Sequence, residues 1–394
     1  MYKSLLVLIG LVLCIGSLQA QQSSLDQLLQ SIAANNKTLV AYRSHIDGES
    51  WQYKSKNKLP DPQASAYYLP FGEHNTGDYT EFEISQQFEF PTVYAARDNW
   101  IDEQEKRLEY EYQKLRQAVL LKAQKLGLEL IYLQKQRQLV QERVNQSKKV
   151  NDQIQTLFDK GQTGILDRNK ARIIWLDQQF ALEELDTREN SIKQELQSLN
   201  GGNEVNLQMS TYPNTIEIPV SDSLWNERLN RDAQIALLEQ QKKVAQQKLK
   251  VERNLLLPDI TAGYNYQGVS GSNYSGFYGG ISIPLWSGRS NVKVAKAQVD
   301  YYDQYQSELM TSFKGTFISQ IQRYQMLLNK FREYERAMNG LNSEMLLQKS
   351  YELGEISFMD YYREVSFYRE AENRMLEIEK EIQQLRAELL KHQL

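Results

Sequence analysis

The chain has 394 residues, of which 24% are charged and only 8 are prolines, and its formal net charge is -4. A sequence so polar and so poor in proline is typical of long exposed helices rather than of two or three ordinary globular domains. The slightly acidic balance argues against binding to nucleic acid, which requires a basic stripe.

Residues 1-20 form the first predicted element. Lys3 precedes an apolar run that is too short to span a bilayer and ends in small residues, which predicts a secretory signal peptide cleaved after Ala20. The alternative is a lipoprotein signal acylated at Cys14, although Leu13 stands where such a signal needs a small residue. Cleavage after Ala20 leaves no cysteine, and therefore no disulfide framework, catalytic thiol or thiolate metal site.

Residues 21-202 are predicted to form the first of two repeats. Apolar residues at three- and four-residue steps predict a helix from Ser23 to about Asn57, which a pair of prolines ends. Two strands are expected within about residues 63-90, and a long helical hairpin over about 92-200.

The second strand of this repeat carries the clearest pattern. From Thr80 to Phe90 apolar and polar residues alternate, with Phe82, Ile84, Phe88 and Phe90 on one face and Glu81, Glu83, Ser85, Gln87 and Glu89 on the other. A solvent-facing strand of a sandwich would show this pattern. So would a membrane-barrel strand with phenylalanine toward lipid and glutamate toward a water-filled lumen.

The same order of elements recurs 193 residues later. Pro91 and Gly161 are 70 residues apart, and so are Pro284 and Gly354. This equal spacing predicts a duplication, and each proline-free run would be about 100 Å long as a helix. Residues 203-222 are interpreted as a linker, and 223-394 as the second repeat, with strands at about 259-284 and a helical hairpin at about 286-391.

Enzyme chemistry finds no support in the sequence. The three histidines, His45, His74 and His392, are scattered, and there is no phosphate loop, nucleophile elbow or dinucleotide fingerprint. We therefore expect no catalytic activity, no cofactor and no metal site.

Four strands cannot close a barrel, because about eight are the minimum and an open edge in lipid leaves backbone groups unpaired. The chain would have to complete a barrel with copies of itself. Two copies would give eight strands and three would give twelve.

Several features together resemble the TolC family of outer-membrane efflux channels. They are the signal peptide, the duplicated order of elements, the strand endings Phe90-Pro91 and Ile283-Pro284-Leu285-Trp286-Ser287-Gly288, and the turns Gly161-Gln162-Thr163-Gly164 and Gly354-Glu355-Ile356-Ser357. The resemblance covers essentially the whole mature chain. It implies a mostly α protein with a membrane β-barrel portion, in which a homotrimer forms a twelve-stranded barrel in the cell outer membrane and an α-helical tunnel in the periplasm.

The resemblance also implies partners and a function. Such a channel passively conducts substrate that a periplasmic adaptor (membrane fusion) protein and an inner-membrane pump deliver, for example a pump of the resistance-nodulation-division type. The residues that would dock on the adaptor are those of the two hairpin tips: Gly161, Gly164, Asp167, Gly354 and Ser357.

Members of the family often narrow the closed tunnel mouth with aspartates just past the second tip. Asp360 matches the first such position, whereas Arg363 stands at the second, so the resemblance implies a gate of mixed charge. These two side chains, at positions i and i+3 of a helix, can pair along one helix face.

Glu81, Glu83 and Glu89 would place nine carboxylates in the lumen of a trimer, a field that favours cations. This fits export of heavy-metal ions, but equally of drugs or proteins. The rival function is that of a periplasmic coiled-coil adaptor or scaffold without a pore, which would explain the hairpins but not the duplicated strand pairs.

Overall fold

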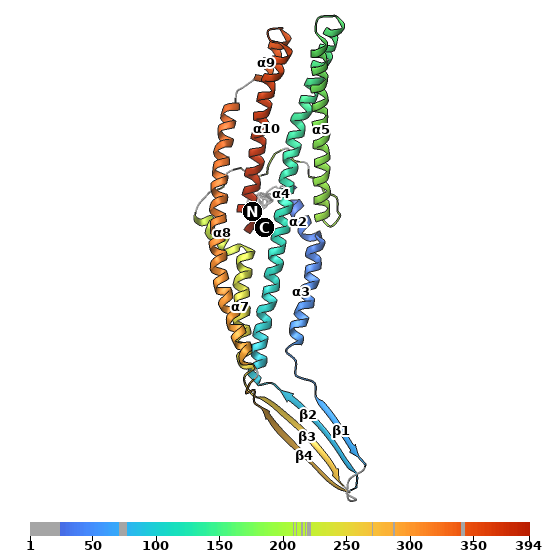
Figure 1. Ribbon diagram of the computed structural model, residues 1–394, viewed down its shortest axis with the longest axis vertical. Helices are drawn as coiled ribbons and strands as arrows, with labels where there is room; N and C mark the ends of the chain where they lie inside the picture. The colour runs from blue at the N-terminus through green and yellow to red at the C-terminus, as the bar shows by residue number, and fades with distance from the viewer. Residues whose placement is uncertain are drawn as a thin grey trace, which may run out of the picture. The chain divides into compact units, whose positions relative to one another are not determined.

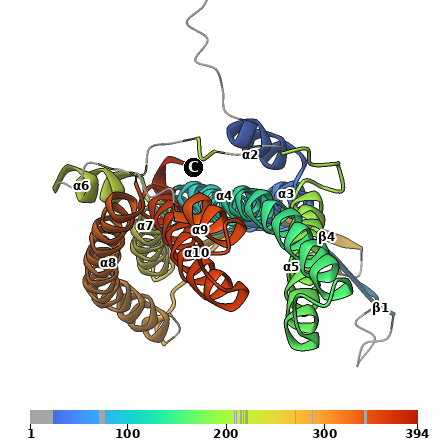
Figure 2. The same cartoon turned by 90° about the horizontal axis from the view of Figure 1, so that it is seen from above.

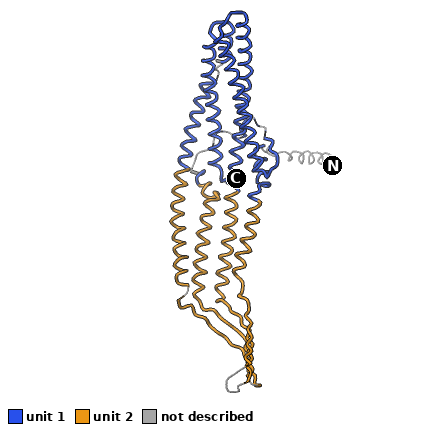
Figure 3. The backbone as a smooth tube through the Cα atoms, turned by 45° about the vertical axis from the view of Figure 1, so that its right-hand side comes forward, with its two compact units in different colours: residues 1–39, 116–225, 317–394 blue, residues 40–115, 226–316 orange. Residues whose placement is uncertain are grey.

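The structure is a computed structural model that describes residues 24-70, 77-207, 209, 211-213, 216, 218, 222-269, 271-286, 288-339 and 343-394. The predicted signal peptide, Cys14 and His74 lie outside these residues. The chain divides into two compact units, one made of residues 1-39, 116-225 and 317-394 and the other of residues 40-115 and 226-316 (Figure 3). Each unit therefore draws on both predicted repeats.

A four-stranded antiparallel sheet in the second unit joins the two repeats (Figure 1). Its strands lie in the order β1 (Gln63–Leu69), β2 (Tyr79–Phe88), β3 (Asp259–Val269) and β4 (Ser272–Ser282). β2 of the first repeat pairs with β3 of the second along its whole length, from Tyr79 opposite Val269 to Phe88 opposite Ile260. Among the described residues, no further strand pairs with the outer edges of β1 and β4.

The helices of this unit follow the order of the strands to which they connect. They are α3 (Lys37–Ser55), the first part of α4 (Pro91–Asp159), α7 (Ala233–Asn254) and the first part of α8 (Arg289–Met338), with most of the short α6 (Asp222–Arg231). Contacts between neighbouring helices fix the order α3-α4-α7-α8: Arg43 with Glu109, Gln240 with Glu103, and Lys242 with Asp303.

The first unit contains α2 (Ser24–Asn35), the later parts of α4 and α8, α5 (Ile165–Leu199), α9 (Ser343–Glu352), α10 (Phe358–Leu389) and the 3-10 helix η2 (Lys391–Gln393). Ion pairs set the order α5-α4-α10-α8, which Figure 2 shows along the helices: Arg137 with Asp186, Lys135 with Glu379, and Arg323 with Glu381.

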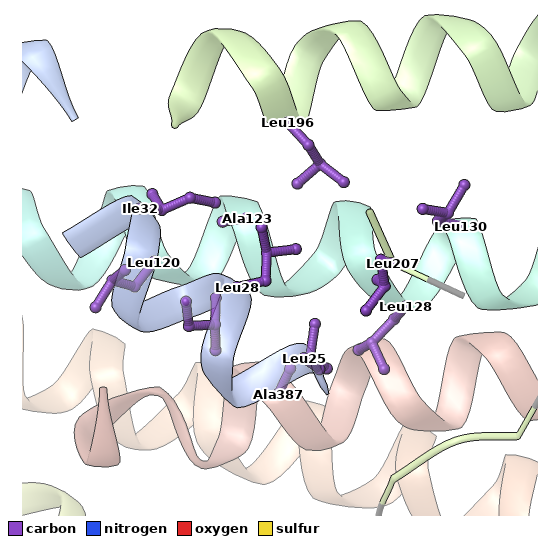
Figure 4. Packing of buried hydrophobic residues seen from close by; sticks show 11 residues of the cluster. Leu25, Leu28, Ile32, Leu120, Ala123, Leu128, Leu130, Leu196, Leu207 and Ala387 are labelled. Atoms are coloured by element: carbon purple, nitrogen blue, oxygen red, sulfur yellow. The ribbon is translucent and has the colours of Figure 1, made fainter. Parts of the chain in front are cut away.

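The main apolar core of this unit lies where α2 crosses α4. Leu25, Leu28 and Ile32, spaced three and four residues apart, point to one face of α2 and are buried. They pack with residues of α4 and with Leu196 of α5 and Ala387 of α10 (Figure 4). The short helix α2 thus ties three long helices together.

Three features differ from the sequence-based expectations. The first helix is split at Asn36, whose side chain accepts a hydrogen bond from the Leu39 backbone N-H at 3.1 Å and donates one to the Leu199 carbonyl at 2.8 Å. Asn36 therefore caps α3 while it holds the end of α5.

The two long runs are also unequal. α4 is a single helix of 69 residues, about 100 Å long at the usual rise. The corresponding run of the second repeat is divided into α8, which ends at Met338, and α9, which begins at Ser343.

The predicted linker is, where described, a packed strap rather than a free connection. Leu207 is buried in the core at α2, and the hydroxyl of the buried Tyr324 on α8 donates to the Ile216 carbonyl at 2.5 Å and accepts from the Ile218 N-H at 2.9 Å. We call the described residues between 203 and 218 the strap. No helix of the described residues combines the length and apolar character needed to cross a bilayer.

Candidate functional site

The cross-strand register places polar side chains of three strands on one face of the sheet. Glu81 lies opposite Gln267, and Glu83 opposite Asn265. The Glu81 carboxylate accepts hydrogen bonds from the Tyr79 hydroxyl at 2.7 Å, from Asn265 Nδ2 at 2.6 Å and from Gln267 Nε2 at 3.3 Å. A hydrogen-bonded acidic network therefore crosses from β2 to β3.

Glu83 extends this network to β4, because its carboxylate accepts a hydrogen bond from the Tyr278 hydroxyl. The ring of Tyr278 lies over Gly263 of the intervening strand, where a Cβ atom would be 2.5 Å from Tyr278 Cε1. Any side chain at position 263 would displace the ring. Because Gly263 has no side chain, Tyr278 of β4 can reach across β3 to Glu83 of β2.

The opposite face of the sheet is apolar and exposed. Phe277 is 91% exposed, Ile281 71%, Ile84 60% and Phe82 55%. Cross-strand pairing places Ile84, Tyr264 and Phe277 in one row and Phe88, Ile260 and Ile281 in another. Gln86 lies on this face between the two rows. A largely apolar face of this kind needs an apolar environment or a partner to cover it.

Glu89 differs from the other two predicted lumen carboxylates. It lies beyond the end of β2, and its two oxygens bind Arg97 of α4, at 2.7 Å from Nη1 and 2.8 Å from Nη2. This bidentate pair offsets the charge of Glu89. The acidic face of the sheet in one chain thus rests on Glu81, Glu83 and Asp259, whose carboxylate accepts a hydrogen bond from Gln87 Nε2 at 3.2 Å.

The two hairpin tips share one backbone geometry. Gly161 and Gly354 have φ values of +70° and +76°, and each is followed by a residue whose N-H bonds to the carbonyl five positions back: Gln162 to Leu157 at 2.8 Å, and Glu355 to Ser350 at 2.9 Å. This helix-ending motif needs a left-handed residue, which glycine adopts without strain.

The residues that begin the returning helices also correspond. Gly164 is the N-cap of α5 and Ser357 the N-cap of α10, both in extended backbone conformation. The Ser357 hydroxyl accepts from the Asp360 N-H at 3.2 Å and donates to Asp360 Oδ2 at 2.6 Å. In the first tip, Thr163 Oγ1 instead donates to Asp167 Oδ2 at 3.3 Å.

Asp360 and Arg363 are paired and lie in solvent. Arg363 Nη2 donates to Asp360 Oδ1 at 2.8 Å, while its Nε lies 3.5 Å from Glu364, and its side chain is 71% exposed. The hydrogen bond from Ser357, followed by the charge of Arg363, holds the pKa of Asp360 below its ordinary value. The Asp360 carboxylate is therefore charged at neutral pH.

No protein-family model matches this sequence, and no curated protein matches it significantly. Solved structures do match. CusC, whose structures concern folding and transmembrane channel formation, superposes with a TM-score of 0.76 at 14% identity, over 94% of this chain and 91% of CusC. VceC, an outer membrane protein of Vibrio cholerae, gives 0.74 at 15% identity over 93% of this chain and 95% of VceC. The CmeC outer membrane channel of Campylobacter jejuni gives 0.70 at 15% identity over 94% and 85%.

The chain has the fold of TolC-like outer-membrane efflux channels. The resemblance inferred from the sequence is therefore confirmed at the level of the fold. Because CusC matches over 94% of this chain, the TolC-like fold takes in both the sheet and the helical hairpins.

Within this TolC-like fold, sequence reasoning missed the partners of the acidic residues. Asn265, Gln267 and Tyr278 belong to the other repeat, about 190 positions away, and the β2-β3 and β3-β4 pairings together bring them to Glu81 and Glu83. Arg97 is eight residues after Glu89. A cationic residue one or two helical turns after the end of a strand could have predicted this ion pair from the sequence.

The described part of the chain contains no group of three or more His, Cys, Asp or Glu residues placed to hold a metal ion. His45 stacks edge-on against Tyr42 in α3, and His392 is buried in η2.

Proposed function

We propose that this protein is the outer-membrane channel of a tripartite efflux system. It passively conducts substrate, received from a periplasmic adaptor and an inner-membrane pump, to the cell exterior. One observation carries the proposal: a sheet with an exposed apolar face and a hydrogen-bonded acidic face, within a TolC-like fold. The apolar face suits outer-membrane lipid and the acidic face a water-filled lumen, with the helices in the periplasm.

The two unpaired edges of the sheet, β1 and β4, support assembly into a homotrimer. β1 and β4 present two different edges, so copies can pair head to tail, and such contacts form a ring when the rotation from one copy to the next closes. The outermost helices of the first unit also carry exposed apolar side chains, among them Leu166, Ile173, Leu176 and Phe180 on α5 and Ile318, Met326, Met345 and Leu346 on α8 and α9. Three copies would close a barrel of twelve strands, as the resemblance to the TolC family implies.

The tips are the proposed docking surface for the adaptor, through Gly161, Gly164, Asp167, Gly354 and Ser357. Their shared turn geometry supports this role, because two equivalent turns per chain present six similar surfaces in a trimer. Asp360 and Arg363 are proposed to form the periplasmic gate. Their exposure leaves both charges available to neighbouring copies.

The cargo is proposed to include cations. Glu81, Glu83 and Asp259 supply nine carboxylates to a trimeric lumen, whereas Glu89 adds little because Arg97 neutralises it. This charge suits metal ions and cationic drugs alike. The pump, rather than the channel, would choose among metal ions, drugs and proteins.

The alternative, a periplasmic adaptor or scaffold without a pore, leaves the apolar face of the sheet unexplained. The oligomeric mass, measured in detergent, distinguishes the two functions. A detergent-dependent particle of about three chains supports the channel, whereas a monomer that stays in solution without detergent contradicts it.

A further inference from the structure

The first unit contains a cleft that the channel function does not require. It lies between α4, α8 and α10 and has a volume of about 630 Å³. Its lining includes Tyr132 and Gln136 of α4, Tyr334 of α8, and Phe367, Glu370 and Glu377 of α10. A volume of this size suits a small organic molecule.

The cleft lies on the opposite side of α10 from the strap. Glu379 faces the strap, because it binds Lys135, whose ammonium lies 4.7 Å from the centre of the Tyr212 ring. Glu377 precedes Glu379 by two residues and so points about 200° away around the helix. The two remaining sides of α10 face its neighbouring helices: Leu376 packs against α4 and Ile382 against α8.

The direction in which the cleft opens follows from the proposed function, on which this step rests. In a conducting tunnel the strap has to lie outside, because a segment that crossed the interior would obstruct it. The cleft, on the other side of α10, then opens into the lumen. A trimer carries three such clefts in its wall.

Aromatic rings form the walls of the cleft. Phe367 is 67% exposed, and Tyr334 and Tyr132 lie across from it on two other helices. Tyr132 already binds a cation of its own chain, because Lys380 Nζ lies 4.2 Å from the centre of its ring. That charge is offset by Glu129, 3.5 Å from Lys380. The ring of Phe367 offers its surface to an added ligand.

The charge of the cleft selects the sign of the ligand. Glu377 is paired with Arg374 at 2.8 Å, whereas Glu370 forms no ion pair within the described residues and is exposed. The lining therefore keeps one unbalanced negative charge beside aromatic surface. A metal ion would find a single free carboxylate, which is too few ligands.

We propose that this cleft binds a monovalent organic cation with a planar apolar body, held by the rings of Phe367 and Tyr334 and by the carboxylate of Glu370. The site sits in the tunnel wall and takes its ligand from the lumen. It gives the channel an affinity of its own for aromatic cations, in addition to the choice made by the pump.

The test uses the full mature chain in neutral detergent, titrated with ethidium while its fluorescence anisotropy is recorded. We expect saturable binding. Phe367→Leu and Glu370→Gln should each weaken it about threefold to tenfold. Phe367→Leu removes the aromatic ring but keeps an apolar side chain, and Glu370→Gln removes the negative charge. Glu364→Gln, at an exposed carboxylate of the same helix, is the matched control and should leave the affinity unchanged. Fluorescein, an anionic dye of similar size, should not bind.

Absence of saturable binding, or equal weakening by Glu364→Gln, would overturn the proposal. Planar-bilayer recordings on the same preparation separate it from the proposed function. Conductance without ethidium binding refutes the cleft alone. Ethidium binding that depends on Phe367 and Glu370 in a protein without conductance supports the cleft and refutes the channel.

Discussion

Asp360 combines two roles, because the side chain that would set the charge of the gate also takes part in the N-cap of α10. Its carboxylate accepts from the Ser357 hydroxyl at 2.6 Å and from Arg363 at 2.8 Å. Both contacts favour the ionised form, so the pKa lies below the ordinary value of 3.8. The stabilisation that these contacts give is fully present above pH 3.8, and it is lost as the pH falls through the lowered pKa of Asp360.

The first prediction concerns this pH dependence. The part of the closed-state cation selectivity that Asp360 supplies should decline with a midpoint below pH 3.8. Ser357→Ala removes the largest cause of the lowered pKa, so the midpoint of the decline should move to higher pH. Reversal-potential measurements across a pH series check this, and a midpoint unmoved by Ser357→Ala would show that the Ser357 hydroxyl does not lower the pKa of Asp360.

The second prediction tests the gate. Asp360→Ala should raise the closed-state conductance or lower its cation selectivity, because one carboxylate per chain leaves the mouth and Arg363 loses its partner. Asp167→Ala, at the corresponding position of the first tip, is the control and should have little effect on either quantity. Single-channel behaviour that Asp360→Ala leaves unchanged would remove the gate assignment.

The third prediction concerns the backbone of the tips. Gly354→Ala forces a side chain into a left-handed conformation, at a cost of about 1-2 kcal/mol. Hydrogen exchange of the tip amides should therefore become roughly tenfold faster. Gly48→Ala is the control, because Gly48 lies inside α3 with no atom within 4 Å of an added Cβ, and this change should slow local exchange. Equal effects of the two substitutions would contradict the role assigned to the turn.

The sheet edges carry the fourth prediction, at the scale of the elements. In a closed barrel β1 of one copy pairs with β4 of the next, whereas within one chain β2 and β3 separate these strands by about 14 Å. Ser65→Cys combined in turn with Tyr274→Cys, Gly276→Cys or Tyr278→Cys should give a disulfide-linked trimer for the pair in register. The mature chain has no other cysteine if cleavage follows Ala20.

Non-reducing gel electrophoresis reads the outcome of the cross-linking. Covalent trimers from one of the three pairs support ring closure through these edges. Monomers from all three pairs, or dimers that never extend to trimers, contradict it. Ser65→Cys alone is the control, because its thiol has no partner across the edge.

Strands and turns were predictable because their signals are local. A two-residue period fixes the faces of a strand, and the left-handed position of the tip turn requires glycine at the same place in both copies. The split at Asn36 was missed, because its cause is a contact with the Leu199 carbonyl more than 160 residues away. The division between α8 and α9 also escaped, since absence of proline does not guarantee a continuous helix.

At the scale of the whole molecule, duplication predicted the order of the elements but not how they combine. The compact units cut across the repeats, because β2 pairs with β3 and α10 packs between α4 and α8. The acidic network of the sheet depends on the same cross-repeat pairing. A sequence period therefore reveals two similar halves and their two tips, while the acidic network of the sheet arises only where the halves meet.

The measurement that tests the channel function most directly is the conductance of the purified protein in a planar lipid bilayer. We predict discrete, cation-selective single-channel steps from a particle of three chains, with selectivity reduced when Glu81 and Glu83 are both replaced by glutamine. A correctly folded protein that inserts into the bilayer and passes no current would contradict this function.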